Sequence, residues 1–273
     1  MTMRAVFLAL AMILGLAAPA AAQVPARTIF YMAYDDGTVV SYGNPAERIP
    51  TQSQSKLLLG YYVLTHGTEA EKTQVEPMIA VSSDYWAGVF DRRYPQAIDT
   101  VAREWGLTGT SRGRSWGWAT TTALDMARMM QIIRQDPLAA PLRWGMEHAA
   151  AVAADGYPQD YGTATIPGVR GTKFGWSDEG DTNITASYGD GWVAVANTYG
   201  TAPEQTADVQ AALPAVLGEA APETAENFTI SLGRFEIPAV TGAMVKAKVR
   251  CVPLPLADTQ LVPLQLYLIL PRC

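Results

Sequence analysis

The stretch that decides the fold is Ile49–Lys56, IPTQSQSK, which is followed directly by LLLGYYVL at positions 57–64. A run that is apolar on all sides is typical of a helix buried on all sides. Ser53, Ser55 and Lys56 stand at the start of this run. A lysine amine that loses its water there costs free energy unless it has a partner. The stretch therefore predicts a buried helix with reactive polar groups at its first turn.

Ser53 and Lys56 are three residues apart, so on a helix their side chains lie on one face and can touch. A serine hydroxyl becomes a good nucleophile when a base takes its proton, and a lysine is such a base when burial lowers its pKa. The backbone N–H groups of a helix N-terminus can stabilise a developing oxyanion. The same spacing also arises from a capping serine followed by a lysine whose stem covers apolar surface. The pair needs support from other segments.

Two further segments give that support. Residues 78–84, MIAVSSD, place Ser82 and Asp84 after an apolar helical turn, and residues 171–176, GTKFGW, place Lys173 just before a predicted hairpin. The order of the three segments matches the S-x-x-K, S-x-N and K-T-G signature of penicillin-recognising serine enzymes.

The remaining pattern predicts strands at both ends of the chain and helices between them. Turn residues between runs of β-forming residues predict two hairpins, at 28–42 and 183–199. Period-3.6 patterns predict helices over 97–105 and 120–134, and a further helix is predicted at 206–217, interrupted by Pro214. The region 50–155 is predicted to be mostly helical. The fold class expected is α+β: one antiparallel sheet built from both termini, flanking helices and an all-helical insert.

Taken together, these segments resemble the β-lactamase/DD-peptidase superfamily, and more closely the exported class A β-lactamase-like serine hydrolases of bacteria. The resemblance covers about residues 28–217. It implies that Ser53 is the acylated nucleophile and Lys56 its base. Ser82 would relay a proton to the leaving group, and Lys173 would add positive charge near Ser82 and a substrate carboxylate.

The resemblance also implies the substrate-binding positions. Asp84 would occupy the place that usually holds Asn, and Gly175 and Trp176 would lie along the substrate, with the N–H groups of Ser53 and Trp176 as the oxyanion hole. Ser83-Asp84-Tyr85 is a competing register for the second motif. Tyr85, Trp86, Trp116, Trp118 and Trp176 either line a groove or pack the helical insert.

Two departures from the family pattern bear on activity. The residue after Lys173 is Phe174, where the family has a Thr or Ser hydroxyl that holds a substrate carboxylate. The stretch 108–118, TGTSRGRSWGW, has no carboxylate, whereas class A β-lactamases use a Glu there to activate the deacylating water. We expect a hydrolase or acyltransferase that acts on a peptide or amide bond, such as one in cell-wall material, and not an efficient β-lactamase. The alternative is a non-catalytic binding module with the same fold.

The N-terminal residues predict export, and the C-terminal residues predict a separate extension. Residues 1–22 have a basic start, an apolar segment at 5–18 and small residues at 20–22, as in a secretory signal peptide, and the apolar segment is short for a membrane span. We expect the hydrolase domain at 23–218 and an extension of unassigned role at 219–273. Export would permit a Cys251–Cys273 disulfide.

The composition argues against several partners. The formal net charge of −6 disfavours nucleic acid and anionic membrane surfaces as partners. With two histidines in the whole chain, a histidine-based metal site is not expected, nor is a cofactor.

Overall fold

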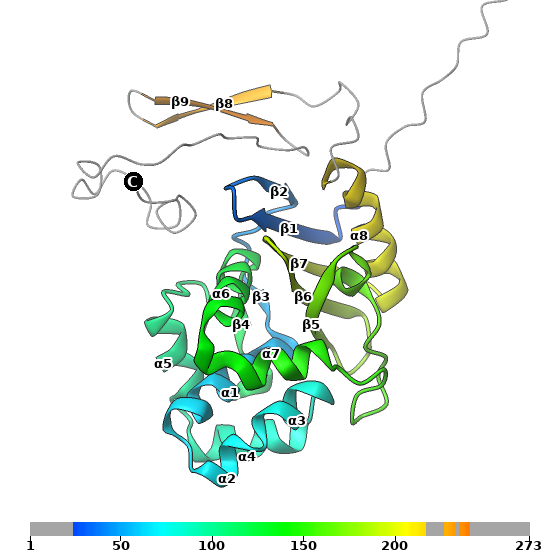
Figure 1. Ribbon diagram of the computed structural model, residues 1–273. Coiled ribbons are helices and arrows are strands. Elements are labelled where there is room, and N and C mark those ends of the chain that lie inside the picture. Colours follow the sequence, from blue (N-terminus) through cyan, green and yellow to red (C-terminus); the bar gives the residue numbers. More distant parts are fainter. Residues whose placement is uncertain (1–23, 217–226, 233–234, 241–273) are drawn as a thin grey trace, which may run out of the picture.

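The computed structural model describes residues 24–216, 227–232 and 235–240. Its centre is a five-stranded antiparallel sheet in the order β2-β1-β7-β6-β5 (Figure 1). The strands are β1 (Thr28–Tyr34), β2 (Val39–Tyr42), β5 (Val169–Trp176), β6 (Thr182–Gly189) and β7 (Trp192–Tyr199). The first strand pairs along its whole length with β7, from Thr28 opposite Thr198 to Tyr34 opposite Trp192. The sheet is therefore built from both ends of the domain, as the sequence predicts.

Helices cover both faces of this sheet (Figure 1). The helical insert lies on one face, and α8 (Ala202–Val216) lies on the other. The helices of the insert are α1 (Ser55–His66), α2 (Glu69–Lys72), α3 (Val75–Ala80), α4 (Asp84–Arg93), α5 (Ala97–Glu104), α6 (Ala123–Gln135) and α7 (Ala140–Glu147). Short segments join them: strands β3 (Ile49–Pro50) and β4 (Thr120–Thr121), and 3₁₀ turns η1 (Gln52–Gln54), η2 (Trp116–Trp118), η3 (Pro137–Ala139) and η4 (Gly162–Thr165).

The alternation of side chains along β1 explains the two layers. Ile29 and Tyr31 point into the core shared with the helical insert, whereas Phe30 and Met32 point into the core shared with α8. Successive residues of a strand face opposite sides of a sheet, so a strand that is apolar at every position is covered on both faces.

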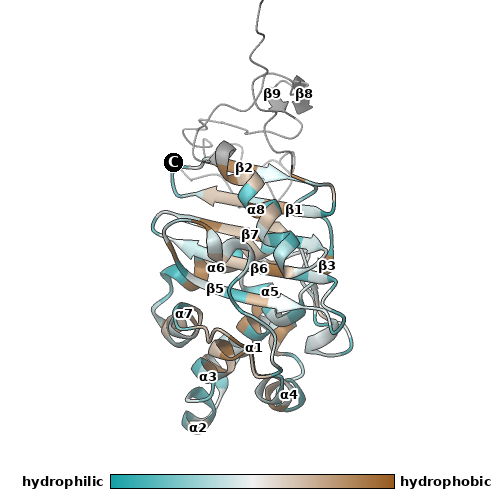
Figure 2. Cartoon of the chain, turned by 90° about the vertical axis from the view of Figure 1, so that its right-hand side faces the viewer, coloured by the Kyte–Doolittle hydropathy of each residue, from teal (hydrophilic) through white to brown (hydrophobic). Residues whose placement is uncertain are grey.

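Hydrophilic residues gather at the outer end of the insert, along α2 (Figure 2).

Three predicted boundaries differ from the structure. The chain after Pro50 first forms the 3₁₀ turn η1, and α1 begins only at Ser55. The helix predicted from residue 120 begins at Ala123, because Thr120 and Thr121 pair with β3 and Thr122 is the N-cap of α6. The last helix begins at Ala202, four residues earlier than predicted, and continues past Pro214. Its start is a capping box, in which Thr201 and Glu204 bond each other's backbone N–H groups.

Strands β8 (Asn227–Leu232) and β9 (Phe235–Val240) form a separate two-stranded antiparallel sheet. The predicted signal peptide at 1–22 and both cysteines, Cys251 and Cys273, lie outside the described residues. Within the described residues, no helix has the length and apolar character needed to cross a bilayer.

Close packing between α3 and α7 gives a stability prediction. A Cβ on Gly145 of α7 would lie 2.7 Å from Ile79 Cβ and 2.8 Å from the carbonyl oxygen of Glu76. Gly145→Ala should therefore lower the free energy of unfolding by about 1–3 kcal/mol, since the backbone of α3 must move. Denaturant unfolding followed by circular dichroism measures this change.

Gly88→Ala in α4 is the matched control. A Cβ on Gly88 would meet only the mobile end of Arg92, at 3.2 Å. Because alanine is the better helix former, this variant should be neutral or more stable by up to about 1 kcal/mol. Equal effects of the two substitutions would contradict the packing described for α3 and α7.

Candidate active site

Ser53 lies in the 3₁₀ turn η1, between β3 and the buried helix α1. The Thr51 N–H donates to the carbonyl of Ala119, which fixes the entry of this turn. Gln52, directly before Ser53, has a φ of +47°, a left-handed conformation that non-glycine residues rarely adopt. Such conformations cost about 1–3 kcal/mol and occur preferentially at functional sites.

Ser53, Lys56, Ser82 and Lys173 form one continuous chain of hydrogen bonds. Lys56 Nζ donates to Ser53 Oγ at 2.6 Å, and it lies 3.2 Å from Ser82 Oγ and 2.8 Å from the Ser82 carbonyl oxygen. From the other side, Lys173 Nζ donates to Ser82 Oγ at 2.8 Å. These residues come from η1, α1, the α3–α4 turn and β5, so the fold brings together three segments that are distant in sequence.

Burial controls the charge state of both amines. Lys56 is fully buried, and this desolvation lowers its pKa, while the nearby carboxylate of Asp84 acts in the opposite direction. Asp84 Oδ1 lies 2.5 Å from Lys56 Nζ. The pKa of Lys173 is held well below its usual value by burial and then by the positive charge of Lys56. A lowered pKa makes the neutral amine, which can accept a proton, accessible nearer neutral pH.

A close contact between η1 and β5 places Lys173 beside Ser53. The Gln54 amide donates from Nε2 to the Lys173 carbonyl oxygen at 2.8 Å. A Cβ on Gly175 would lie 2.9 Å from the Ser53 backbone nitrogen, so only glycine permits this approach of β5. The sequence points to Gly175 through its motif, but nothing in the sequence identifies Gln54 as the side chain that joins the two elements.

The structure distinguishes the two candidate serines of the second motif. Ser82 has a φ of +51° and lies between the two lysine amines. Ser83 instead caps α4, since its Oγ accepts a hydrogen bond from the Trp86 N–H at 3.4 Å. The geometry therefore favours Ser82 as the hydroxyl that contacts the lysines.

Asp84, Trp176 and Asp155 lie at the solvent side of the site. The Asp84 side chain is 62% exposed although its carboxylate contacts the buried Lys56. The Trp176 ring stacks on Tyr157 with centroids 4.6 Å apart, and its Nε1 donates to Asp155 Oδ2 at 3.0 Å. The charge of Asp155 raises the pKa of both lysines. Sequence reasoning missed Asp155, which sits in a loop without a recognisable motif.

The two departures from the family pattern have clear structural counterparts. Phe174 is buried against Tyr161 and Ala202, so this position offers no hydroxyl to a substrate. The stretch 108–118 presents Trp116 to the site, with its ring centroid 4.8 Å from Lys56 Nζ. An aromatic ring over an ammonium favours the charged form but cannot take a proton from water.

The five aromatic residues singled out in the sequence do not form one set. Trp116 covers Lys56 and Trp176 stacks on Tyr157, whereas Trp86 packs against Phe90. Tyr85 and Trp118 are exposed, and Trp118 carries the Arg114 guanidinium over its ring.

Comparison with solved structures shows which known proteins share this fold. No protein-family model and no curated protein matches this chain. Solved structures do match. A β-lactamase from Sphaerobacter thermophilus is 13% identical with a TM-score of 0.54, and the match covers 71% of this chain and 93% of that one. A structure described as PBP-A is 16% identical with a TM-score of 0.55, over 71% of this chain and 90% of that one. An ancestral class A β-lactamase is 17% identical with a TM-score of 0.55, over 71% and 95%.

Many of the matching structures are β-lactamases or penicillin-binding proteins, and each of these matches covers 68–71% of this chain. The predicted α+β architecture is thereby confirmed. The chain has the fold of the β-lactamase/DD-peptidase superfamily.

Proposed function

We propose that this protein is an exported Ser-Lys hydrolase or acyltransferase that cleaves a peptide or amide bond through an acyl-enzyme. The observation that carries the proposal is the unbroken hydrogen-bonded chain from Ser53 through Lys56 and Ser82 to Lys173. A structural role alone does not account for two buried lysine amines that converge on one serine hydroxyl, since burying a lysine is costly.

In the proposed acylation step, neutral Lys56 takes the proton of Ser53 Oγ, and Oγ forms a bond to the substrate carbonyl carbon. The resulting oxyanion accepts hydrogen bonds from the backbone N–H groups of Ser53 and Trp176. As the carbon–nitrogen bond breaks, Ser82 gives its proton to the leaving amine and receives one from Lys56. The positive charge of Lys173 stabilises Ser82 while its proton is in transit.

The proposed deacylation step is slow. Attack of water on the acyl-enzyme needs a base, and the stretch 108–118 supplies Trp116 where a carboxylate would be needed. An enzyme of this kind transfers its acyl group to an amine or hydrolyses it over a long lifetime. The substrate proposed is a peptide derived from the cell wall, which fits a secretory signal at 1–22.

A non-catalytic binding module is the second candidate. It is favoured by Phe174, which removes a substrate-binding hydroxyl, and by the missing carboxylate in the loop. The two candidates differ in whether Ser53 can be acylated.

The first prediction concerns acylation. Incubated with a fluorescent penicillin or a fluorophosphonate, the protein should gain one adduct that maps to Ser53 by mass spectrometry. Ser53→Ala should abolish labelling, and Lys56→Ala should slow it by about 100-fold or more because the base is lost. Ser55→Ala is the matched control, since Ser55 Oγ bonds the Gln52 carbonyl and should leave labelling unchanged. No adduct with either probe would favour the binding module.

The second prediction concerns pH. Asp84 raises the pKa of Lys56 by its charge and its hydrogen bond, so Asp84→Asn should lower that pKa. Because neutral Lys56 is the base, the rise of labelling rate with pH should then occur at lower pH in the variant. Asp155→Asn, which removes a weaker charge effect, should shift the profile less. A profile that moves to higher pH in Asp84→Asn would exclude Lys56 as the base.

The third prediction concerns the lifetime of the adduct. After excess penicillin is removed, the Ser53 adduct should persist for minutes or longer, as judged by intact-protein mass over time. Rapid turnover of the antibiotic would show that another group activates the water.

A further inference from the structure

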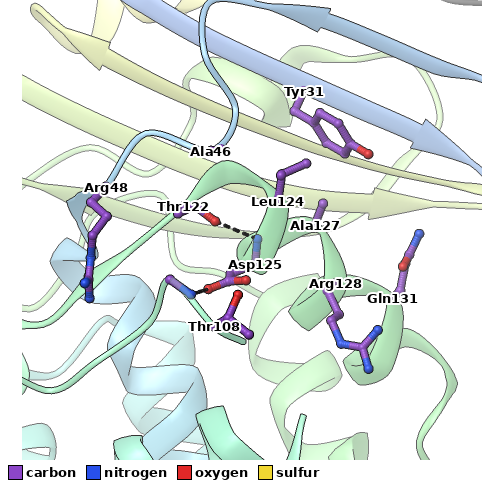
Figure 3. Close-up of a pocket in the computed structure, with 11 residues that line it drawn as sticks. Tyr31, Ala46, Arg48, Thr108, Thr122, Leu124, Asp125, Ala127, Arg128 and Gln131 are labelled. Atoms are coloured by element: carbon purple, nitrogen blue, oxygen red, sulfur yellow. Dashed lines mark hydrogen bonds between the residues drawn. The ribbon is translucent and has the colours of Figure 1, made fainter. Parts of the chain in front are cut away.

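A second site lies apart from Ser53, in a cavity of about 240 Å³ beside α6 (Figure 3). Its wall is formed by β1, the segment before β3, the loop after α5 and one face of α6. The lining residues are Tyr31, Ala46, Arg48, Thr108, Gly109, Thr122, Leu124, Asp125, Ala127, Arg128 and Gln131. None of the seven residues proposed for the active site is among them.

Three charged side chains line this cavity, and they are not paired with one another. In Figure 3, Arg48 and Arg128 lie on either side of Asp125. Within the described part of the chain, no ion pair within 4.0 Å involves any of the three. By contrast, Arg112 binds both carboxylate oxygens of Asp91.

Each of these groups keeps bonding capacity for a ligand. Arg48 donates from Nη2 to Ser111 and Thr120, and Arg128 donates from Nε to the Trp105 carbonyl oxygen, which leaves guanidinium N–H groups without a bond among the described residues. Asp125 accepts two hydrogen bonds at Oδ2, from the Gly109 N–H and the Thr110 hydroxyl, while Oδ1 has none from the described residues.

Burial affects the charge state of Asp125 and Arg128. Burial raises the pKa of Asp125 and lowers the pKa of Arg128, whereas the attraction between these two charges, and that of Arg48 for Asp125, acts in the opposite direction. A ligand that forms ion pairs with these side chains would offset part of the free-energy cost of burying their charges. Two guanidinium groups and one carboxylate would be paired by a ligand with two anionic groups and one cationic group.

We propose that this cavity binds an acidic α-amino acid or a molecule of that size and charge. Its two carboxylates would pair with Arg48 and Arg128, and its ammonium would pair with Asp125. The cavity volume fits a molecule of about ten non-hydrogen atoms, at the small end of natural ligand pockets. The Thr108 and Gln131 side chains offer further hydrogen bonds at the wall.

The site adjoins the loop that carries Trp116. Arg48 bonds Ser111 and Thr120, which pair with each other across the base of that loop, and Thr108 and Gly109 at the start of the loop line the cavity. A ligand that binds Arg48 would therefore contact the residue that holds the base of the loop whose Trp116 ring covers Lys56.

Isothermal titration of the full chain tests the proposal with L- and D-glutamate as probes. At least one enantiomer should bind with a stoichiometry of one. Glutarate, which lacks the ammonium, and 4-aminobutyrate, which lacks one carboxylate, should each bind at least about tenfold more weakly, as expected when a charge pair is lost. Absence of binding by both enantiomers, or equal binding of glutarate or sulfate, would overturn the proposal.

Substitutions at the cavity wall test whether glutamate binds in this cavity. Ala46→Phe should block the cavity, since the Ala46 side chain is exposed at its wall, and Arg128→Gln should remove one carboxylate partner. Both should weaken glutamate binding at least about tenfold, whereas Arg103→Gln, a surface arginine of α5 outside the cavity, should not. Binding that is unchanged in both cavity variants would place the ligand elsewhere and refute the assignment. Because the readout is binding, its failure leaves the proposed acylation chemistry untouched.

Discussion

The Lys56 amine sits at the start of a helix that is buried on all sides, and its position constrains everything around it. An amine in such surroundings must be met by oxygen atoms, and the structure supplies them from Ser53, Ser82 and Asp84. Ser82 is in turn held by Lys173 on β5. Satisfying one amine thus fixes the relative placement of α1, the α3–α4 turn and, through Ser82, the edge of the sheet.

The distribution of charge around this amine differs from that implied by the family resemblance. The loop at 108–118 contributes an aromatic ring, and the second motif contributes a carboxylate where the family has an amide. The site therefore keeps an anionic partner for Lys56, but that partner lies on the side of α4 and bonds the lysine directly. A carboxylate engaged in this way stabilises the ammonium, whereas the acylation proposed above starts from the neutral amine.

Much of the fold can be read from the sequence because its signals are local. The hairpin turns, the apolar run of α1 and the β-forming residues of β1 each predict their own element, and the three motifs predict which segments meet. Contacts between distant segments leave no such signal: Gln54 bonds the Lys173 carbonyl, and Asp155 reaches Trp176 from an irregular loop. The left-handed backbone at Gln52 and Ser82 is equally hidden, since neither residue type favours it. The helix α8 begins four residues before its predicted start, at a capping box formed by Thr201 and Glu204.

The pairing of β1 with β7 has a consequence for how the polypeptide acquires its structure. Thr28 lies opposite Thr198, so the first strand, although it can pair with β2 at once, has to wait for almost the whole domain before its second neighbour, β7, exists. Pairing over such a separation is entropically costly and slow. The strand that bears Lys173 also emerges late, so a nascent chain with Ser53 and Lys56 already in place lacks the second amine. The chemistry proposed for Ser53 therefore requires that synthesis has passed the central strands, since a shorter chain lacks part of the proposed site.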